Sequence, residues 1–67
     1  MKQIRLAAAR VDAGISQGDM ATKMKVSKTT IVNWESYRVI PKPGQFEMYC
    51  RICGFEPDDI FLPQSST

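Results

Sequence analysis

The sequence predicts an all-α fold, a compact domain of five short helices. Apolar residues recur at helical spacing in several segments, and no segment alternates with a period of two for long enough to predict a strand. Serines, prolines and glycines stand where the helical segments begin and end. With 67 residues and 43% hydrophobic content, the chain can bury one small core. We therefore expect one domain over residues 1–62 and a polar tail over residues 63–67.

The first predicted helix spans residues 2–13 and ends at Gly14, which can adopt the left-handed conformation that follows many helices. Two stripes of residues run along this helix at helical spacing, and every member except Arg10 is apolar. One stripe consists of Leu6, Ala9, Arg10 and Ala13, and the other consists of Ile4, Ala7, Ala8 and Val11. Periodicity alone leaves open which stripe faces the core.

The next two helices are predicted over residues 17–24 and 28–36, and both open with the same capping device. Ser16 and Ser27 can each accept a hydrogen bond from a free backbone N–H of the first turn. The residue before each cap, Ile15 or Val26, is spaced to pack against an apolar residue in the following turn. Two capped helices joined by a tight turn predict a helix-turn-helix unit, so nucleic-acid binding is the leading functional hypothesis.

The last third of the chain predicts two more helices. Pro43 suits the first position of a helix over residues 43–53, and Gly54 ends it. The sequence Pro57-Asp58-Asp59 favours the start of a short final helix, because carboxylates are stabilised at a helix N-terminus.

Cys50 and Cys53 form a CxxC pair in the fourth helix. The chain has no histidine and no third cysteine, so one chain cannot close a zinc site. A thioredoxin-like motif would need a preceding strand, which the sequence does not predict. Helical spacing places both cysteines on one face with Phe46 and Tyr49, so we interpret them as small apolar core residues. Free thiols also fit a reducing compartment.

Charge is unevenly distributed, although the net charge is only +2. Residues 22–42 hold five basic residues and one acid, whereas residues 56–59 hold three acids and no base. A basic centre and an acidic end favour an oriented contact with a polyanion, although an ordinary solvated surface could show the same pattern. No apolar run approaches the roughly 18 residues of a membrane span, and the N-terminus lacks a signal-peptide apolar region.

The third helix is predicted to have two opposite sides. Ile31 and Trp34 face inward, and the other side consists of Lys28, Thr29, Val32 and Asn33. Lysine can donate to guanine, asparagine can pair with adenine through two hydrogen bonds, threonine can bond a base edge, and valine can pack on a thymine methyl. These four residues are the predicted base-reading positions. An exposed valine is also common on surfaces without a partner.

Contacts to the DNA backbone are expected around that helix. Gln17 and Ser27 stand at helix starts, where free backbone N–H groups favour an anion. The third helix is followed by Tyr37, Arg38 and Lys42, which could contact phosphates on the far side of the groove. Such contacts position a protein on DNA without specifying sequence, and a solvated loop is the alternative for each residue.

The order and ungapped spacing of several short motifs carry a resemblance to a known family. They are Arg10, Gly14-Ile15-Ser16-Gln17, Met20-Ala21, Val26-Ser27, Thr30-Ile31, Trp34-Glu35, Pro41, Gly54 and Asp58-Asp59-Ile60-Phe61. With these residues, the segment from about Leu6 to Phe61 resembles the Cro/CI-type (XRE-like) phage-repressor helix-turn-helix family. The resemblance implies a lambda-repressor-like fold of five helices, a third helix that reads bases, and operator binding as a dimer. It also implies a structural ion pair between Arg10 and Glu35.

Two residues depart from the family pattern. Lys25 stands where the family usually has glycine in the turn between the second and third helices, and Tyr37 stands where glycine often follows the Trp-Glu pair. Both positions are expected to need a left-handed backbone, which costs a residue other than glycine on the order of 1 kcal/mol. Lys25 should be tolerated, whereas Tyr37 puts the geometry of the following loop in question.

The sequence therefore predicts a sequence-specific double-stranded DNA-binding transcriptional regulator, a homodimer at least on DNA. We expect a cytoplasmic, nucleoid-associated protein of a bacterial or phage-infected cell, with no membrane contact, cofactor, metal or small-molecule ligand. It should not be an enzyme, because histidine and a glycine-rich phosphate loop are both lacking.

Two alternatives stay open. Exposed apolar candidates, which are Ile4, Val11, Met48 and Ile52, would suit a protein-interaction module such as an antitoxin or anti-repressor, or else homodimerisation. The chain could also be the DNA-binding fragment of a longer regulator, although its start at Met1 and its polar end favour a small, complete Cro-like protein.

Overall fold

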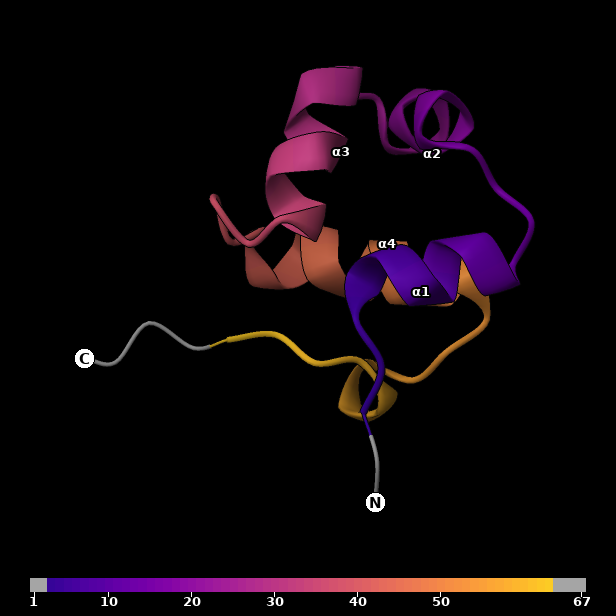
Figure 1. The fold of residues 1–67 in the computed structure, drawn as a ribbon, viewed down its shortest axis with the longest axis vertical. Coiled ribbons are helices and arrows are strands. Elements are labelled where there is room, and N and C mark those ends of the chain that lie inside the picture. The colour runs from indigo at the N-terminus through magenta and orange to yellow at the C-terminus, as the bar shows by residue number, and fades with distance from the viewer. Residues whose placement is uncertain (1–2, 64–67) are drawn as a thin grey trace.

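Four α-helices and one turn of 3-10 helix follow one another along residues 3–63, the part of the chain that this computed structural model describes. The elements are α1 (Leu6–Asp12), α2 (Gln17–Met24), α3 (Lys28–Glu35), α4 (Pro43–Cys53) and the 3-10 turn η1 (Pro57–Asp59). Figure 1 shows α2 and α3 at one end of the molecule, α1 and α4 across its middle, and η1 at the opposite end. The all-α class is confirmed, but the five-helix count is wrong, because the last element is a single 3-10 turn.

Local capping sets most of the helix boundaries. Ser16 Oγ accepts a hydrogen bond from the backbone N–H of Asp19 at 3.0 Å, and Ser27 Oγ accepts one from Thr30 at 3.1 Å. The predicted bounds of α2 and α4 are confirmed. Helix α3 ends at Glu35, one residue earlier than predicted, with Ser36 as its C-cap.

The same C-terminal motif closes all four helices. In each case the residue after the last turn has a left-handed backbone, and the next N–H donates to a carbonyl five residues earlier. The left-handed residues and their φ angles are Gly14 (73°), Lys25 (59°), Tyr37 (60°) and Gly54 (82°). The closing bonds are Ile15 to Arg10 (3.2 Å), Val26 to Ala21 (3.0 Å), Arg38 to Asn33 (2.9 Å) and Phe55 to Cys50 (2.9 Å). The left-handed backbone expected at Lys25 and Tyr37 is therefore confirmed.

The first helix is shorter than predicted, because the chain before it pairs with the end of the domain. Ile4 forms an isolated parallel β-bridge with Ile60. The N–H of Ile4 donates to the carbonyl of Asp59 at 3.0 Å, and the N–H of Phe61 donates to the carbonyl of Ile4 at 2.7 Å. These bonds hold the backbone extended up to Arg5, so α1 begins only at Leu6. Residues 2 and 64–67, which carry the rest of the predicted first helix and most of the predicted tail, lie outside the described residues.

The core lies where the four helices meet. It consists of Leu6, Ala9, Met20, Ala21, Met24, Ile31, Trp34, Tyr49, Cys50, Cys53 and Ile60. The stripe of α1 with Leu6 and Ala9 faces this core, whereas Val11 of the other stripe is 64% exposed. Ala13, the C-cap of α1, is exposed as well. Both cysteines are buried free thiols, which confirms their reading as core residues.

Candidate nucleic-acid interface

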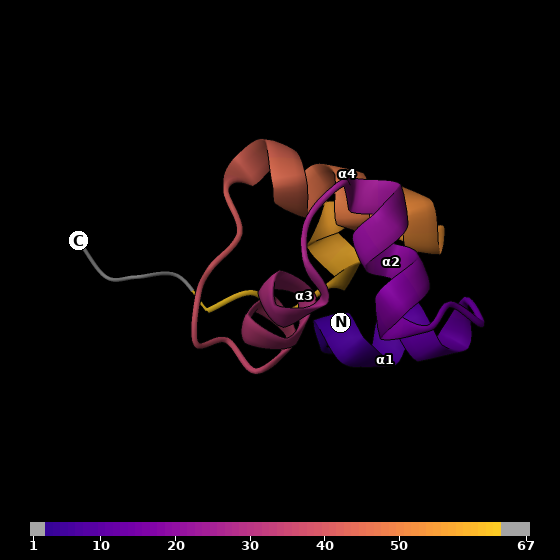
Figure 2. The same cartoon turned by 90° about the horizontal axis from the view of Figure 1, so that it is seen from above.

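Two buried side chains anchor α3 to the rest of the fold. Ile31 is fully buried and Trp34 is 2% exposed, and both pack into the core with Met20 and Met24 of α2. Figure 2 views α3 nearly end-on and shows it beside α2, with the connecting turn between them. Because the turn after α2 is closed by its own hydrogen bonds, the second helix of the unit leaves the first at a fixed angle.

The side of α3 opposite those anchors carries the four predicted base-reading residues. Lys28 and Thr29 are exposed, Val32 is 41% exposed, and Asn33 is partly exposed. Within residues 3–63, none of their side chains forms a hydrogen bond or an ion pair. All four side chains are thus accessible and chemically available, as base reading would require.

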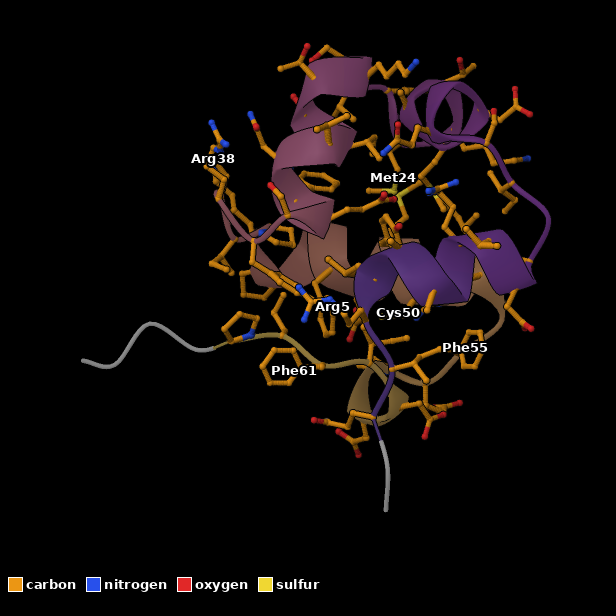
Figure 3. All side chains as sticks on the ribbon, viewed as in Figure 1. Arg5, Met24, Arg38, Cys50, Phe55 and Phe61 are labelled. Carbon is orange, nitrogen blue, oxygen red and sulfur yellow. The ribbon has the colours of Figure 1, made fainter. Side chains whose placement is uncertain are left out.

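The predicted backbone-contact residues fall into two groups. Ser27, Arg38 and Lys42 are exposed. Arg38 extends from the end of α3 away from α1 and α2 (Figure 3). The hydroxyl of Ser27 is already a cap, and it shares a hydrogen bond with Thr30 Oγ1 at 2.9 Å. Arg38 and Lys42 carry free charged ends on the link that follows α3.

Gln17 and Tyr37 form the second group, because their polar ends are used inside the fold. Gln17 Nε2 donates to Glu35 Oε1 at 3.1 Å. The hydroxyl of Tyr37 donates to the carbonyl of Phe61 at 2.7 Å and accepts from the N–H of Leu6 at 3.2 Å. Because its one hydrogen is donated to Phe61, the Tyr37 hydroxyl has no hydrogen left for a phosphate.

The ring of Tyr37 also joins the two ends of the domain. It meets the ring of Phe61 edge to face at 5.7 Å, and the guanidinium of Arg5 lies 4.7 Å from its centroid. A bulky residue occupies this left-handed position because its side chain makes contacts that glycine could not make.

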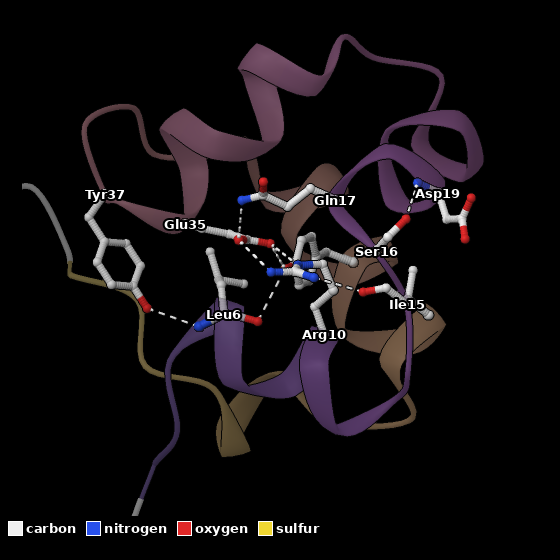
Figure 4. A network of polar contacts seen from close by, with 9 residues as sticks. Leu6, Arg10, Ile15, Ser16, Gln17, Asp19, Glu35 and Tyr37 are labelled. Atoms are coloured by element: carbon white, nitrogen blue, oxygen red, sulfur yellow. Dashed lines mark hydrogen bonds and ion pairs between the residues drawn. The ribbon is translucent and has the colours of Figure 1, made fainter.

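A buried carboxylate at the end of α3 is the centre of a polar network (Figure 4). Glu35 is 8% exposed, and Arg10 Nε lies 2.6 Å from Glu35 Oε2 while Arg10 Nη2 lies 3.2 Å from Oε1. The ion pair that the family resemblance implies is present. Arg10 Nη1 also donates to the carbonyl of Ile15 at 2.7 Å, which ties the start of the helix-turn-helix unit to the same network.

Tyr49 completes this network from α4, a role that the sequence analysis missed. Its hydroxyl lies 2.6 Å from Glu35 Oε2 and 3.1 Å from the carbonyl of Leu6. The sequence did hold a sign of this role, because a tyrosine on the inward face of a helix needs a hydrogen-bond partner for its hydroxyl.

The network shifts the ionisation of its members. Burial acts to raise the pKa of Glu35, but hydrogen bonds from Arg10, Tyr49 and Gln17 outweigh it, so the pKa is lowered. The hydrogen bond with Glu35 raises the pKa of Arg10. Burial, followed by the Glu35 carboxylate, raises the pKa of Tyr49. At neutral pH the group is therefore a charged pair with a neutral phenol.

The same pairing increases the positive character of the surface. Glu35 is the only acid in residues 22–42, and it is buried against Arg10. The five basic residues of this segment, which are Lys23, Lys25, Lys28, Arg38 and Lys42, are all exposed. The surface around α3 therefore presents positive charge that no acid of the same segment offsets.

Comparison with known proteins agrees with this geometry. A family model described as a helix-turn-helix domain matches residues 4–60. No curated protein and no solved structure matches the chain significantly. Within residues 3–63, no helix has both the length and the apolar character needed to cross a bilayer.

Proposed function

Because the chain belongs to the helix-turn-helix domain family, we propose that it is a sequence-specific regulator that binds double-stranded DNA. In this proposal it is of the Cro/CI repressor type, it has no enzymatic activity, and α3 lies in the major groove of an operator. A B-DNA major groove about 12 Å wide accepts an α-helix with its side chains.

The observation that carries the proposal is the two-sided character of α3. Ile31 and Trp34 fix the helix from within, while accessible side chains with no partner among residues 3–63 line the outside. Lys28 would donate to guanine O6 and N7, and Asn33 would make two hydrogen bonds with adenine. Thr29 and Val32 would contact a base edge and a thymine methyl, respectively.

Exposed cations would hold this helix in register. Arg38 and Lys42 would contact phosphates beside the groove, and Ser27 would offer its backbone N–H at the start of α3. The second N–H of the Gln17 amide could donate to a phosphate while the first stays on Glu35. One such module covers few base pairs, so we propose that two copies bind half-sites about 34 Å apart.

Selection of bound sequences from random duplexes tests this function. We expect a palindromic site, and binding to it that falls with salt at a log-log slope of about −4 to −8 for a dimer. Replacement Asn33→Ala should weaken binding to that site by about 1–3 kcal/mol and change binding to random DNA little. Thr22→Ala, which truncates an exposed threonine of α2, is the matched control.

Two results would count against the proposal. An equal loss on the selected site and on random DNA would show that Asn33 does not read bases. If no duplex is enriched and a protein partner co-purifies instead, the interaction-module alternative gains support.

A further inference from the structure

Helix α4 has an outward face that the proposed DNA contact does not use. Tyr49, Cys50 and Cys53 turn inward to the core. The opposite face is shallowly hollowed and is lined by Gly44, Glu47, Met48, Arg51 and Ile52. Met48 is 46% exposed, although it is one of the larger apolar side chains of the domain. In Figure 2 α4 lies along one edge of the molecule, with no further element beyond it.

The residues of this face, hereafter the α4 face, form two parallel rows with opposite chemistry. Helical spacing puts Glu47 and Arg51 along one side, and Met48 and Ile52 along the other. Within residues 3–63, neither Glu47 nor Arg51 takes part in an ion pair. A charged row beside an apolar row is the arrangement of a helix that packs against another helix.

The pattern is complementary to itself when the partner helix runs in the opposite direction. A two-fold axis between positions 49 and 50 would place Glu47 opposite Arg51 of a second copy, and Met48 opposite Ile52 of that copy. The interface would then contain two ion pairs on one side and two apolar contacts on the other. Each group would find a partner of the matching kind, as a symmetric interface requires.

Size is complementary as well as charge. Gly44 is exposed, and a Cβ added there would meet nothing within 4 Å. Phe55, which follows the end of α4, is partly buried against the core and lines the adjoining hollow with Glu47 and Arg51. The same two-fold axis would bring the Phe55 end of a second copy toward the open space at Gly44.

We propose that the α4 face is a dimer interface, and that its partner is a second copy of this chain in antiparallel contact. The argument from DNA rests on the function proposed above, whereas the argument from charge and size does not. Figure 1 shows α4 running across the middle of the molecule, with α2 and α3 together at one end. A two-fold axis that passes across α4, from that end to the opposite one, leaves both copies of α3 at the same end, where one duplex can meet both.

The contact should be weak in free solution. Eleven residues of helix measure about 16 Å, so one helix pair buries less than the roughly 1,600 Å² of a standard interface. Two adjacent half-sites on DNA would raise the effective concentration of the second copy and so strengthen the pairing. A weak dimer of this kind would form mainly on DNA, where two half-sites hold two copies close together.

Charge reversal without DNA tests the interface. In sedimentation equilibrium at high protein concentration, Glu47→Arg and Arg51→Glu should each weaken self-association by about tenfold or more, because each creates two like-charge contacts. An equimolar mixture of the two variants should restore association, because every contact between unlike chains is then an Arg–Glu pair. Asp12→Arg and Lys23→Glu are the controls, since they change exposed charges by the same amounts elsewhere.

Each outcome decides one point. Failure of the mixture to associate, or an equal effect of the controls, would overturn the interface. So would a dimer that both reversals leave intact and that Val11→Glu abolishes, because the interface would then be near Val11, which is exposed on α1. Because these measurements contain no DNA, a positive result combined with failure of the operator selection would leave the α4 face standing and remove only the proposed function.

Discussion

The hydroxyl of Tyr49 and the carboxylate of Glu35 lie 2.6 Å apart, which joins the middle of α4 to the last residue of α3. Arg10 reaches the same carboxylate from α1, and Gln17 reaches it from α2. One carboxylate therefore receives hydrogen bonds from three helices, and the orientation of α3 depends on all of them.

Replacement Tyr49→Phe should reduce the free energy of unfolding by about 1.5–3 kcal/mol. The ring stays in place, but a buried carboxylate loses a donor, and hydrogen bonds to charged groups contribute more than neutral ones. Urea denaturation followed by Trp34 fluorescence measures the change. Tyr37→Phe is the matched control, because its hydroxyl bonds only backbone groups, and we expect a loss of about 0.5–1.5 kcal/mol there. A larger loss at Tyr37 than at Tyr49 would contradict the assignment.

Acid should destabilise the fold through Glu35. Its pKa is lowered in the folded state, so its contribution is fully present above the ordinary value of 4.5 and is lost as pH falls through the lower, folded pKa. Melting temperatures measured between pH 7 and pH 3 should therefore fall below about pH 4.5. Glu35→Gln should be less stable at neutral pH and should show a flatter acid limb. If the melting temperature of this variant falls in acid as steeply as that of the unmodified chain, the loss of stability comes from other carboxylates.

Replacement by glycine should change stability in opposite directions at Lys25 and Tyr37, the two residues other than glycine that have a left-handed backbone. Lys25→Gly removes a left-handed strain on the order of 1 kcal/mol and costs no buried contact, because Lys25 is exposed. Part of that gain is offset by the greater freedom of glycine in the unfolded chain, so we expect a gain of a few tenths of a kcal/mol. Tyr37→Gly relieves the same strain but loses two hydrogen bonds and the contact with Phe61, so it should be destabilising. Relative to the unmodified chain, the urea midpoint should rise for Lys25→Gly and fall for Tyr37→Gly.

The buried thiols should react slowly in the folded protein. Burial raises the pKa of Cys50 to about 11 and that of Cys53 to about 11. A thiol reagent at pH 8 should label them at least about a hundredfold more slowly than in urea, because labelling requires opening of a domain stabilised by a few kcal/mol. Above pH 9 the unfolded thiols ionise first, so stability should decline as pH rises from 9 to 11. Labelling as fast as that of the unfolded chain would contradict burial.

Helix boundaries that depend on neighbouring residues could be predicted from the sequence. The bounds of α2 and α4 follow from Ser16 and Pro43 at their starts, and from Lys25 and Gly54 just beyond their ends. The first helix could not be bounded in this way, because Ile4 is removed from it by pairing with Ile60, which is 56 positions away in the chain. A bond between distant segments leaves no local pattern.

In the candidate site, too, only the features that depend on neighbouring residues could be predicted from the sequence. The spacing of Ile31, Trp34 and the exposed residues of α3 follows from helical geometry alone, and their burial is as predicted. The hydrogen bonds of Gln17 and Tyr37 could not be predicted, because their partners lie 18 and 24 residues further along the chain. Sequence spacing identifies which faces are outward, but it does not show which outward polar groups are already engaged.

The bridge between Ile4 and Ile60 also determines where additional sequence can be attached. It holds the first and last described segments side by side, at the end of the molecule opposite the N-terminus of α3 (Figure 1). A fluorescent reporter or a second module joined by a linker near either segment would therefore emerge far from the predicted base-reading residues. If α3 binds DNA as proposed, such fusions should leave the duplex unobstructed.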